Sequence, residues 1–336
     1  MHFSILPRKS KDAVRCCLFA CLAAALLHAS SGAETNQVPA PAPTAAMHIR
    51  SRLTIYDLKD KSLHVLYTAD KLVQSPNWSR DGSYLVANSD GVLYRFNMKD
   101  ATASPVPLAL DSSYFCNNDH GISPDSKLLA FSAIAKGAAA SQVYLANIDG
   151  SNPRLIVPET PSYFHGWSPD GRWLAIVSER AGNYDIYRIP VAGGPQQRLT
   201  SDPGHDDGPD YSKDGKWIYI NSDRSGREQI WRFPADGAGE HDEKAEQITR
   251  DDFENWFPHP SPDGKWLVFL SFPMGTPGHN ARTEIRLRIL PLKGNAIMAT
   301  QPQVLAEFFG GQGTINVNSW SPDSTRFAFV SYEMLP

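Results

Sequence analysis

The stretch that decides the fold is HGWSPDGRWLAIVSERAGNYDIYRIPVAGGPQQRLT, residues 165–200. Its SPDG segment (168–171) predicts a tight turn, because proline presets φ, aspartate accepts hydrogen bonds from the turn backbone and glycine tolerates positive φ. An apolar run follows at 173–177, and residues 184–189 alternate in polarity after a polar loop. With a short segment before the turn and another at 197–200, the stretch predicts four antiparallel strands.

The same unit occurs six times. The turn motifs begin at Ser79, Ser123, Ser168, Ser212, Ser261 and Ser321, with spacings of 44, 45, 44, 49 and 60 residues. A period of about 40–45 residues is typical of propellers built from four-stranded blades. An aromatic residue precedes the turn in four copies (Trp78, Trp167, Tyr211 and Trp320) and is expected to pack between neighbouring blades. The sequence therefore predicts an all-β, six-bladed β-propeller with four-stranded blades.

The last unit is incomplete, and the missing half is found at the other end of the chain. After the motif at Ser321 only one further strand is expected, at 326–333. The stretch 52–68 contains two alternating strands and a turn but has no motif before it, so it matches the third and fourth strands of a unit. We therefore expect N-terminal strands to complete the C-terminal blade. Such closure removes the unpaired sheet edges of an open array.

The repeats resemble those of a known family. The turn followed by a loop such as SERAGNYDIY (178–187) or SDRSGREQIW (222–231) is similar to the propeller repeats of TolB-like proteins. The resemblance covers nearly all of the chain after residue 48 and implies a propeller but no particular activity. TolB carries an α/β domain before its propeller, for which residues 34–48 leave no room, so the Tol-system role is not expected to follow. Propellers that cover serine hydrolases are also disfavoured, since no G-x-S-x-G motif is present.

The N-terminal residues have the features of a secretory signal. Residues 1–33 combine basic side chains at Arg8, Lys9, Lys11 and Arg15 with an apolar run (16–27) that is too short to span a membrane. Cleavage is expected near Ala33, which implies a periplasmic or secreted protein. The Pro- and Ala-rich segment 34–48 is expected to form an extended tether before a propeller at 49–336.

The cysteine content argues against a disulfide, and the net charge argues against nucleic acid as a partner. Three of the four cysteines lie in the signal, so only Cys116 remains and no internal disulfide is expected. Removing 1–33 takes away four basic residues and Asp12, which changes the formal charge from −4 to −7. No basic run stands out, so nucleic acid is not expected as a partner. We expect a monomer without a transmembrane span after signal cleavage.

The residues that lead into each turn are expected to surround the central channel. Four of these approaches contain histidine, a common metal ligand, with carboxylates and amides beside it. The candidate ligand-binding residues are Asn118, Asp119, His120, His165, His205, Asp207, Glu254, Trp256, His259 and Asn318. The candidate metal ligands are His120, His165 and His259. These histidines stand two or three residues before the motif serine, and strand side chains alternate in direction, so at most three of the four histidines are expected to meet.

Two functions remain open at this point. The first is a binding or scaffold module of the cell envelope, with a protein or oligosaccharide ligand at the channel mouth and no required cofactor. The alternative is a carbohydrate-active enzyme, similar to oligogalacturonate lyases, that uses a divalent metal such as Mn, Zn or Ca. A charge of −7 would not attract a polyanionic substrate, so the non-catalytic module is favoured. The sequence identifies no catalytic residue.

Overall fold

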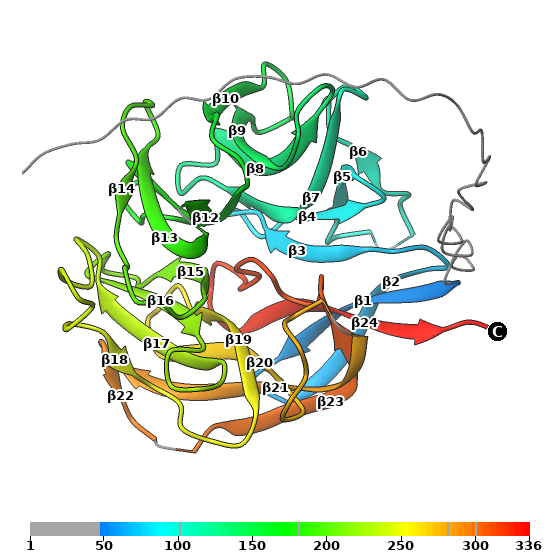
Figure 1. The fold of residues 1–336 in the computed structure, drawn as a ribbon. Coiled ribbons are helices and arrows are strands. Elements are labelled where there is room, and N and C mark those ends of the chain that lie inside the picture. The colour runs from blue at the N-terminus through cyan, green and yellow to red at the C-terminus, as the bar shows by residue number, and fades with distance from the viewer. Residues whose placement is uncertain (1–47, 101, 181, 281, 300) are drawn as a thin grey trace, which may run out of the picture. The chain divides into compact units, whose positions relative to one another are not determined.

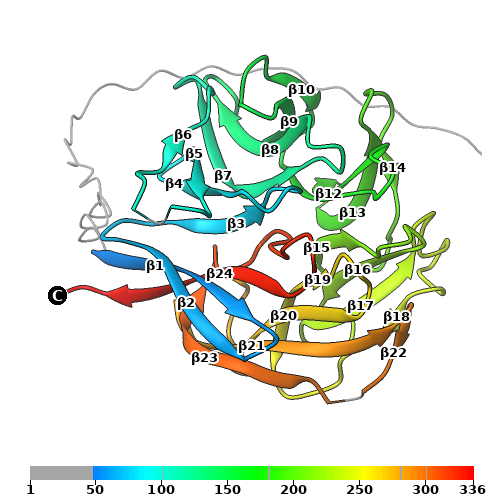
Figure 2. The same cartoon turned by 180° about the vertical axis from the view of Figure 1, so that it is seen from behind.

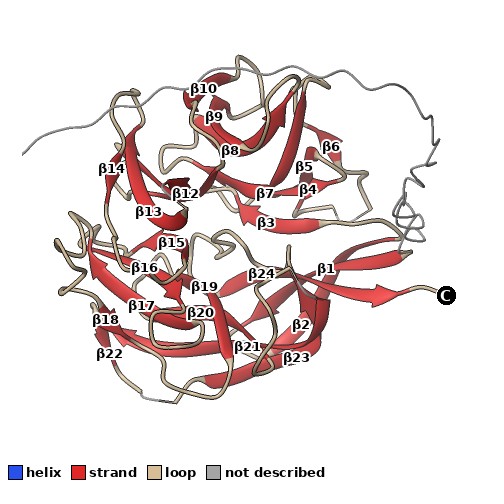
Figure 3. Ribbon diagram, viewed as in Figure 1, coloured by secondary structure: helices blue, strands red, loops and turns tan. Residues whose placement is uncertain are grey.

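The computed structural model describes residues 48–336 except 101, 181, 281 and 300. The predicted signal peptide and nearly all of the predicted tether therefore fall outside the described residues. Within the described part all regular elements are strands (Figure 3). No helix there is long and apolar enough to cross a membrane.

The strands form six sheets, numbered here as blades in chain order. Blade 1 contains β3 (Gln74–Trp78), β4 (Tyr84–Ser89), β5 (Val92–Asn97) and β6 (Val106–Pro107). Blade 2 contains β7 (Tyr114–Ile122), β8 (Leu128–Ala135), β9 (Gln142–Asn147) and β10 (Arg154–Val157). Blade 3 contains β11 (Ser162–Trp167), β12 (Trp173–Arg180), β13 (Asn183–Pro190) and β14 (Gln197–Arg198).

The second half of the chain follows the same pattern with two variations. Blade 4 contains β15 (Asp206–Tyr211), β16 (Trp217–Ser222), β17 (Gln229–Pro234) and β18 (Glu246–Gln247). Blade 5 contains β19 (Glu254–Pro260), β20 (Trp266–Phe272) and β21 (Arg282–Lys293), and β21 pairs with both β22 (Ala296–Ile297) and β23 (Gln303–Gly311). Blade 6 contains β24 (Arg326–Met334), β1 (Ile49–Asp57) and β2 (Ser62–Ala69).

The ring closes as the sequence predicted. β1 lies antiparallel to β24 along its whole length, from Ile49 opposite Met334 to Asp57 opposite Arg326, and β2 pairs with β1 on the other side. Figures 1 and 2 show β1 and β24 side by side, although they come from opposite ends of the described chain. The innermost position of blade 6 is held by an irregular segment that joins the sheet through one bridge, between Trp320 and Phe327. The six-bladed, all-β prediction is confirmed.

The turn motif acts as a hydrogen-bonded clasp in every copy. The serine Oγ donates to Oδ1 of the motif aspartate at 2.6–2.8 Å. The same Oγ accepts a main-chain N–H five residues later, at 2.9–3.0 Å. The fourth residue has φ between 60° and 72°, whether it is glycine, as at Gly171, or serine, as at Ser126 and Ser324. Each motif therefore fixes the hairpin between the first two strands of its blade.

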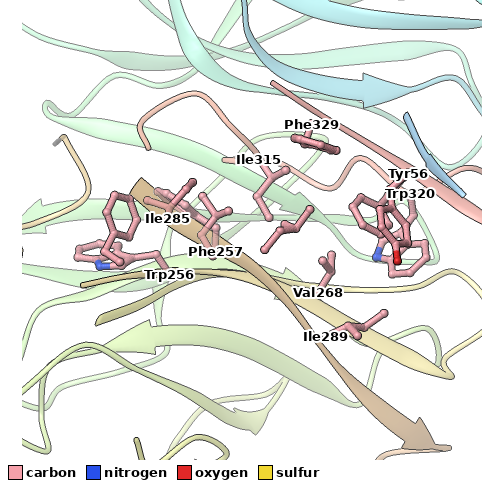
Figure 4. Close-up of a cluster of buried hydrophobic side chains, with 13 residues drawn as sticks. Tyr56, Trp256, Phe257, Val268, Ile285, Ile289, Ile315, Trp320 and Phe329 are labelled. Atoms are coloured by element: carbon pink, nitrogen blue, oxygen red, sulfur yellow. The ribbon is translucent and has the colours of Figure 1, made fainter. Parts of the chain in front are cut away.

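Apolar side chains fill the spaces between neighbouring blades. Trp167 and Trp320, which precede their turns, are buried, and each indole N–H donates to a carbonyl of the preceding blade. Figure 4 shows the cluster between blades 5 and 6, with Trp256 and Phe257 at one end and Trp320 at the other. The interblade core thus extends as far as the aromatic side chains predicted for the channel mouth.

The innermost strands share one irregularity. In the first five blades the register between the first and second strands shifts at a β-bulge, for example between Cys116 and His120 and between Phe164 and Gly166. A bulge leaves extra residues unpaired and re-aims their side chains. These bulges lie where the innermost strands pass the channel, so they determine which residues face it.

Candidate functional site

Two cavities occupy the channel. The mouth cavity, of about 570 Å³, lies where the innermost strands begin, and the exit cavity, of about 250 Å³, lies among the motif turns. The mouth cavity is lined by Asn117, Asn118, Asp119, Tyr163, His165, Val177, Tyr184, His205, Asp207, Asp223, Glu228, Trp256, Phe257, Gly278, His279, Asn280 and Gln312. His165 lines both cavities and so lies between them.

The bulges place the central residues of the mouth cavity. His165 is the unpaired residue of the bulge between Phe164 and Gly166, which leaves its imidazole free to face the channel. Gly208 lies in the bulge of β15 with φ of 61°, and a Cβ there would approach Asn221 Oδ1 to 2.9 Å. Phe257, in the bulge of β19, also has a positive φ, 55°, which is rare for a bulky residue. The backbone is strained next to this cavity, as is common at functional sites.

Asp207 lies close to two histidines of the mouth cavity, His165 and His279. Its Oδ1 lies 3.2 Å from His165 Nε2 and accepts the Gly208 N–H at 2.6 Å, and its Oδ2 lies 3.6 Å from His279 Nδ1. Burial alone raises the pKa of Asp207, but the hydrogen bond from His165 and the nearby imidazoles outweigh burial and hold the pKa below its ordinary value. Burial lowers the pKa of His165, whereas the Asp119 and Asp207 carboxylates raise it to about 9. His165 and Asp207 therefore form a charged pair at neutral pH.

Asp119 differs from Asp207 because its carboxylate is less well compensated. It is 5% exposed, and burial raises its pKa to about 7 despite the attraction of His165. The negative charge of Asp207 contributes to this increase in the pKa of Asp119. At neutral pH this carboxyl is close to half protonated, so a positive charge entering the cavity would ionise it.

A second acid–imidazole pair lies on the blade 4 side. His205 Nδ1 is 3.4 Å from Glu228 Oε1, and the other oxygen of Glu228 accepts from Asn221 Nδ2 at 3.0 Å. Burial lowers the pKa of His205, but Glu228 and Asp207 outweigh burial and raise it to about 9. Burial raises the pKa of Glu228 to about 7, against the opposing effect of His205. Glu228 is thus a second carboxyl that ionises near neutral pH.

Aromatic side chains form the walls around these charges. Tyr163 and Tyr184 have ring centroids 6.5 Å apart, and Tyr184 meets the His205 ring edge-on at 5.4 Å. Trp256 and Phe257 contact the His279 ring at 4.7 and 5.2 Å, and Phe257 stacks on His165 at 6.3 Å. The cavity therefore combines flat apolar surfaces with buried carboxylates.

The predicted metal ligands do not converge. His120 pairs across the sheet with Phe131, its Nε2 lies 3.1 Å from the Val86 carbonyl oxygen, and it lines the exit cavity. Both nitrogens of His259 are occupied, Nδ1 by Asp210 at 3.0 Å and Nε2 by the Ile315 carbonyl at 2.6 Å. Among the residues described, no group of three His, Cys, Asp or Glu side chains is placed to hold a metal ion. The described residues therefore do not assemble the expected triad of His120, His165 and His259, because the imidazoles bond to Val86, to Asp207, and to Asp210 and Ile315 respectively.

The other predicted residues fall into three places. Asn118, Asp119, His165, His205, Asp207 and Trp256 line the mouth cavity. Asn318 and His120 line the exit cavity. Glu254 accepts hydrogen bonds from the main-chain N–H groups of Glu228 and Gly275, and it thereby links two loops beside the mouth cavity. His259 is paired with Asp210.

Several lining residues were not predicted. Glu228 and Asp223 come from the loop between β16 and β17, and His279 and Asn280 come from the loop between β20 and β21. The second loop belongs to the enlarged fifth blade, whose extra length (273–282) was visible in the sequence. That length was the signal that could have identified His279. Glu228 carries no comparable signal, since it lies in the ordinary repeat loop.

Comparison with known proteins places the chain among propellers of one type. A family profile described as the TolB beta propeller domain matches residues 119–284. An uncharacterised protein of Agrobacterium fabrum is 40% identical over 286 residues, which cover 84% of this chain and 93% of that protein. A solved TolB-like structure from Agrobacterium tumefaciens has 39% sequence identity and a TM-score of 0.78, covering 85% of this chain and 99% of that one. The Tol-Pal system protein TolB of Xanthomonas campestris is 39% identical over 71 residues, which are 20% of this chain and 16% of that protein.

Proposed function

The chain belongs to the TolB-like β-propeller family, and we propose that it is a non-catalytic binding module of the cell envelope. In this proposal the mouth cavity receives a segment of a partner protein that carries positive charge. The location is inferred from the signal-like residues 1–33, which imply a periplasmic or secreted protein. The Tol-Pal system role of the Xanthomonas protein is not carried over, because the match to that protein is short.

The observation that carries the proposal is the composition of the mouth cavity. Its described lining includes four carboxylates, Asp119, Asp207, Asp223 and Glu228, and neither lysine nor arginine. His165 and His205 offset part of this charge, but Asp119 and Glu228 have no cation of their own that returns their pKa to the ordinary range. A basic side chain or free amino group would supply the missing positive charge.

The aromatic walls fit the same ligand. Tyr163, Tyr184, Trp256 and Phe257 present ring surfaces within the cavity. Cations are attracted to aromatic faces, and the attraction strengthens when water is excluded. A neutral glycan could also stack on these rings, but it would leave the carboxylates without a partner. The ligand that satisfies both features is therefore a cationic protein segment.

The metal-dependent lyase alternative is not supported by the geometry. Two of its three predicted ligands face other groups, and His165 is engaged by Asp207. The described lining of the mouth cavity also contains no lysine or arginine that would hold an acidic oligosaccharide.

A matched pair of bulky substitutions tests the proposal. Asn280 and Met274 lie on the same loop and are both exposed, but only Asn280 lines the mouth cavity. We expect Asn280→Trp to fill the cavity and to abolish cross-linking of envelope proteins that the wild type captures. Met274→Trp should leave that capture unchanged. The captured partner is then identified by mass spectrometry, and its contact segment should contain lysine, arginine or an amino terminus.

The pH dependence provides a second criterion. Lowering the pH from about 8 to about 6 protonates Asp119 and Glu228, whose pKa values are about 7, so the affinity for a cation should fall. His165 and His205, with pKa values of about 9, stay charged across this range. If both tryptophan variants capture the same partners, or if a glycan array and not a protein gives the cavity-dependent signal, the proposal is wrong.

A further inference from the structure

We propose that the exit cavity, at the other end of the channel, binds a small molecule with two acidic groups, such as a dicarboxylate, between Arg80 and Lys213. This site is separate from the mouth cavity and has the opposite charge character.

The first observation is a departure from the motif. Its second position is proline in four copies, Pro124, Pro169, Pro262 and Pro322, and basic in the other two, Arg80 and Lys213. Proline is the favoured residue there because its φ is preset for the turn. Both basic side chains line the exit cavity, where three of the prolines lie beside them. The two copies of the motif that lack proline at the second position therefore both place a basic side chain at the exit cavity.

The second observation is where these cations come from. Arg80 follows β3 in blade 1 and Lys213 follows β15 in blade 4. In a closed ring of six blades, two blades separate them in either direction, so they approach the cavity from opposite sides. A ligand held by both must therefore present an acidic group at each end. Arginine can bind one carboxylate through two parallel hydrogen bonds, and lysine binds the other as a point charge.

The third observation is that, among the described residues, the hydrogen bonds of these two side chains go to neutral oxygens, although the Asp210 carboxylate also attracts the charge of Arg80. Arg80 donates to the Ile122 carbonyl at 3.2 Å, and Lys213 approaches the Asp263 carbonyl at 3.5 Å. The one carboxylate in the described lining, Asp210, already accepts from His259 Nδ1 at 3.0 Å and Asn318 Nδ2 at 2.8 Å. The exit cavity consequently keeps an excess of positive charge.

The volume limits the size of the ligand. A cavity of about 250 Å³ holds about eight water molecules at their share of liquid volume, near 30 Å³ each. A dicarboxylate of four or so carbons fits this space, whereas a folded segment or an oligosaccharide does not. The ligand class is therefore a small diacid in free solution.

Calorimetric titration of the purified chain with succinate and with butyrate, at constant ionic strength, tests this site. The two probes have the same carbon chain and differ in one carboxylate. We expect succinate to bind about tenfold more tightly than butyrate, since a second charge-assisted contact forms. Arg80→Pro and Lys213→Pro should each weaken succinate binding by about tenfold or more, to the level of butyrate.

The proline variants are designed to fold. Each restores the residue that the other copies of the motif carry, so thermal melting should be unchanged or slightly raised. Lys127→Gln removes a neighbouring turn cation that does not line the cavity, and Asn280→Trp alters only the mouth, so neither should affect succinate binding. The inference is overturned if succinate shows no binding up to about 10 mM. It is also overturned if butyrate binds equally well, or if the proline variants bind succinate as the wild type does.

Discussion

Replacing Asp119 by asparagine should make the protein more stable, and the gain should depend on pH. Asparagine has nearly the same shape as aspartate but does not ionise. Asp119 is 5% exposed, and burial raises its pKa to about 7. In the unfolded chain an aspartate titrates near 3.9. The wild type therefore loses stability whenever the unfolded state ionises more readily than the folded state, and Asp119→Asn removes this loss.

The sign and size follow from these two pKa values. Below about pH 4 the carboxyl is protonated in both states, so it has no effect on stability. Between about pH 4 and pH 7 the unfolded state ionises first, and the destabilisation grows as the pH rises. Above about pH 7 it is constant at about 4 kcal/mol, since the pKa difference is about three and each unit corresponds to about 1.4 kcal/mol. The variant should thus be more stable by about 4 kcal/mol at pH 8 and by about 1.5 kcal/mol at pH 5.

Urea unfolding of both proteins at the two pH values measures this difference. A second readout is the His165 ring in NMR titration, because the loss of the Asp119 charge should lower its pKa from about 9. As a control, Asp170→Asn alters a turn carboxylate whose pKa is lowered to about 2, chiefly by the Ser168 hydroxyl, and should destabilise the fold. The reasoning is refuted if Asp119→Asn matches the wild type at pH 8, or if its gain at pH 5 equals the gain at pH 8.

Four other outcomes can be checked in simpler assays. Gly171→Ala should lower stability by about 1 kcal/mol and Ser126→Gly should raise it slightly in thermal melts, because both positions have φ above 60°. Cys116 should resist iodoacetamide in the folded state, as judged by mass spectrometry, since burial raises its pKa to about 12. Arg224→Ala should cost about 3–5 kcal/mol in urea unfolding, because it leaves two buried carboxylates without their cation. Deleting residues 52–68 should cause aggregation visible by light scattering, because it removes most of β1 and β2 and exposes the edge of blade 6.

The ring could be predicted from the sequence because its determinants are local. Ser168, Asp170 and Gly171 make their clasp within one turn, and the same types recur at nearly constant spacing. The blade that joins the two ends of the chain could also be predicted, since the stretch 52–68 alternates in polarity but has no turn motif before it. These features depend on neighbours in the chain, which the sequence displays directly.

The site could be predicted only in part, because it depends on non-local geometry. His120 and His165 both stand three residues before their motif serine, yet His120 pairs with Phe131 while His165 lies unpaired in its bulge. Simple strand alternation assigns both the same direction, so it cannot separate them. Glu228 and His279 reach the cavity from loops of other hairpins, and their direction is set by packing that the sequence does not show.

The separation between the clasp and the bulge explains how one ring can carry two different sites. The clasps use the third and fourth motif positions and the serine, so the second position can change from proline to Arg80 or Lys213 without loss of the turn hydrogen bonds. The bulged residues lie within the same strands, before the turn motif, and the hydrogen bonds of the clasp do not include them. Strain at Phe257 and the uncompensated charge of Asp119 are tolerated there because the interblade core, in which Trp256 also takes part, supplies the stability. A channel with acidic side chains at its mouth and basic side chains at its exit can therefore arise by substitutions at these two sets of positions, while the repeat that builds the blades stays the same.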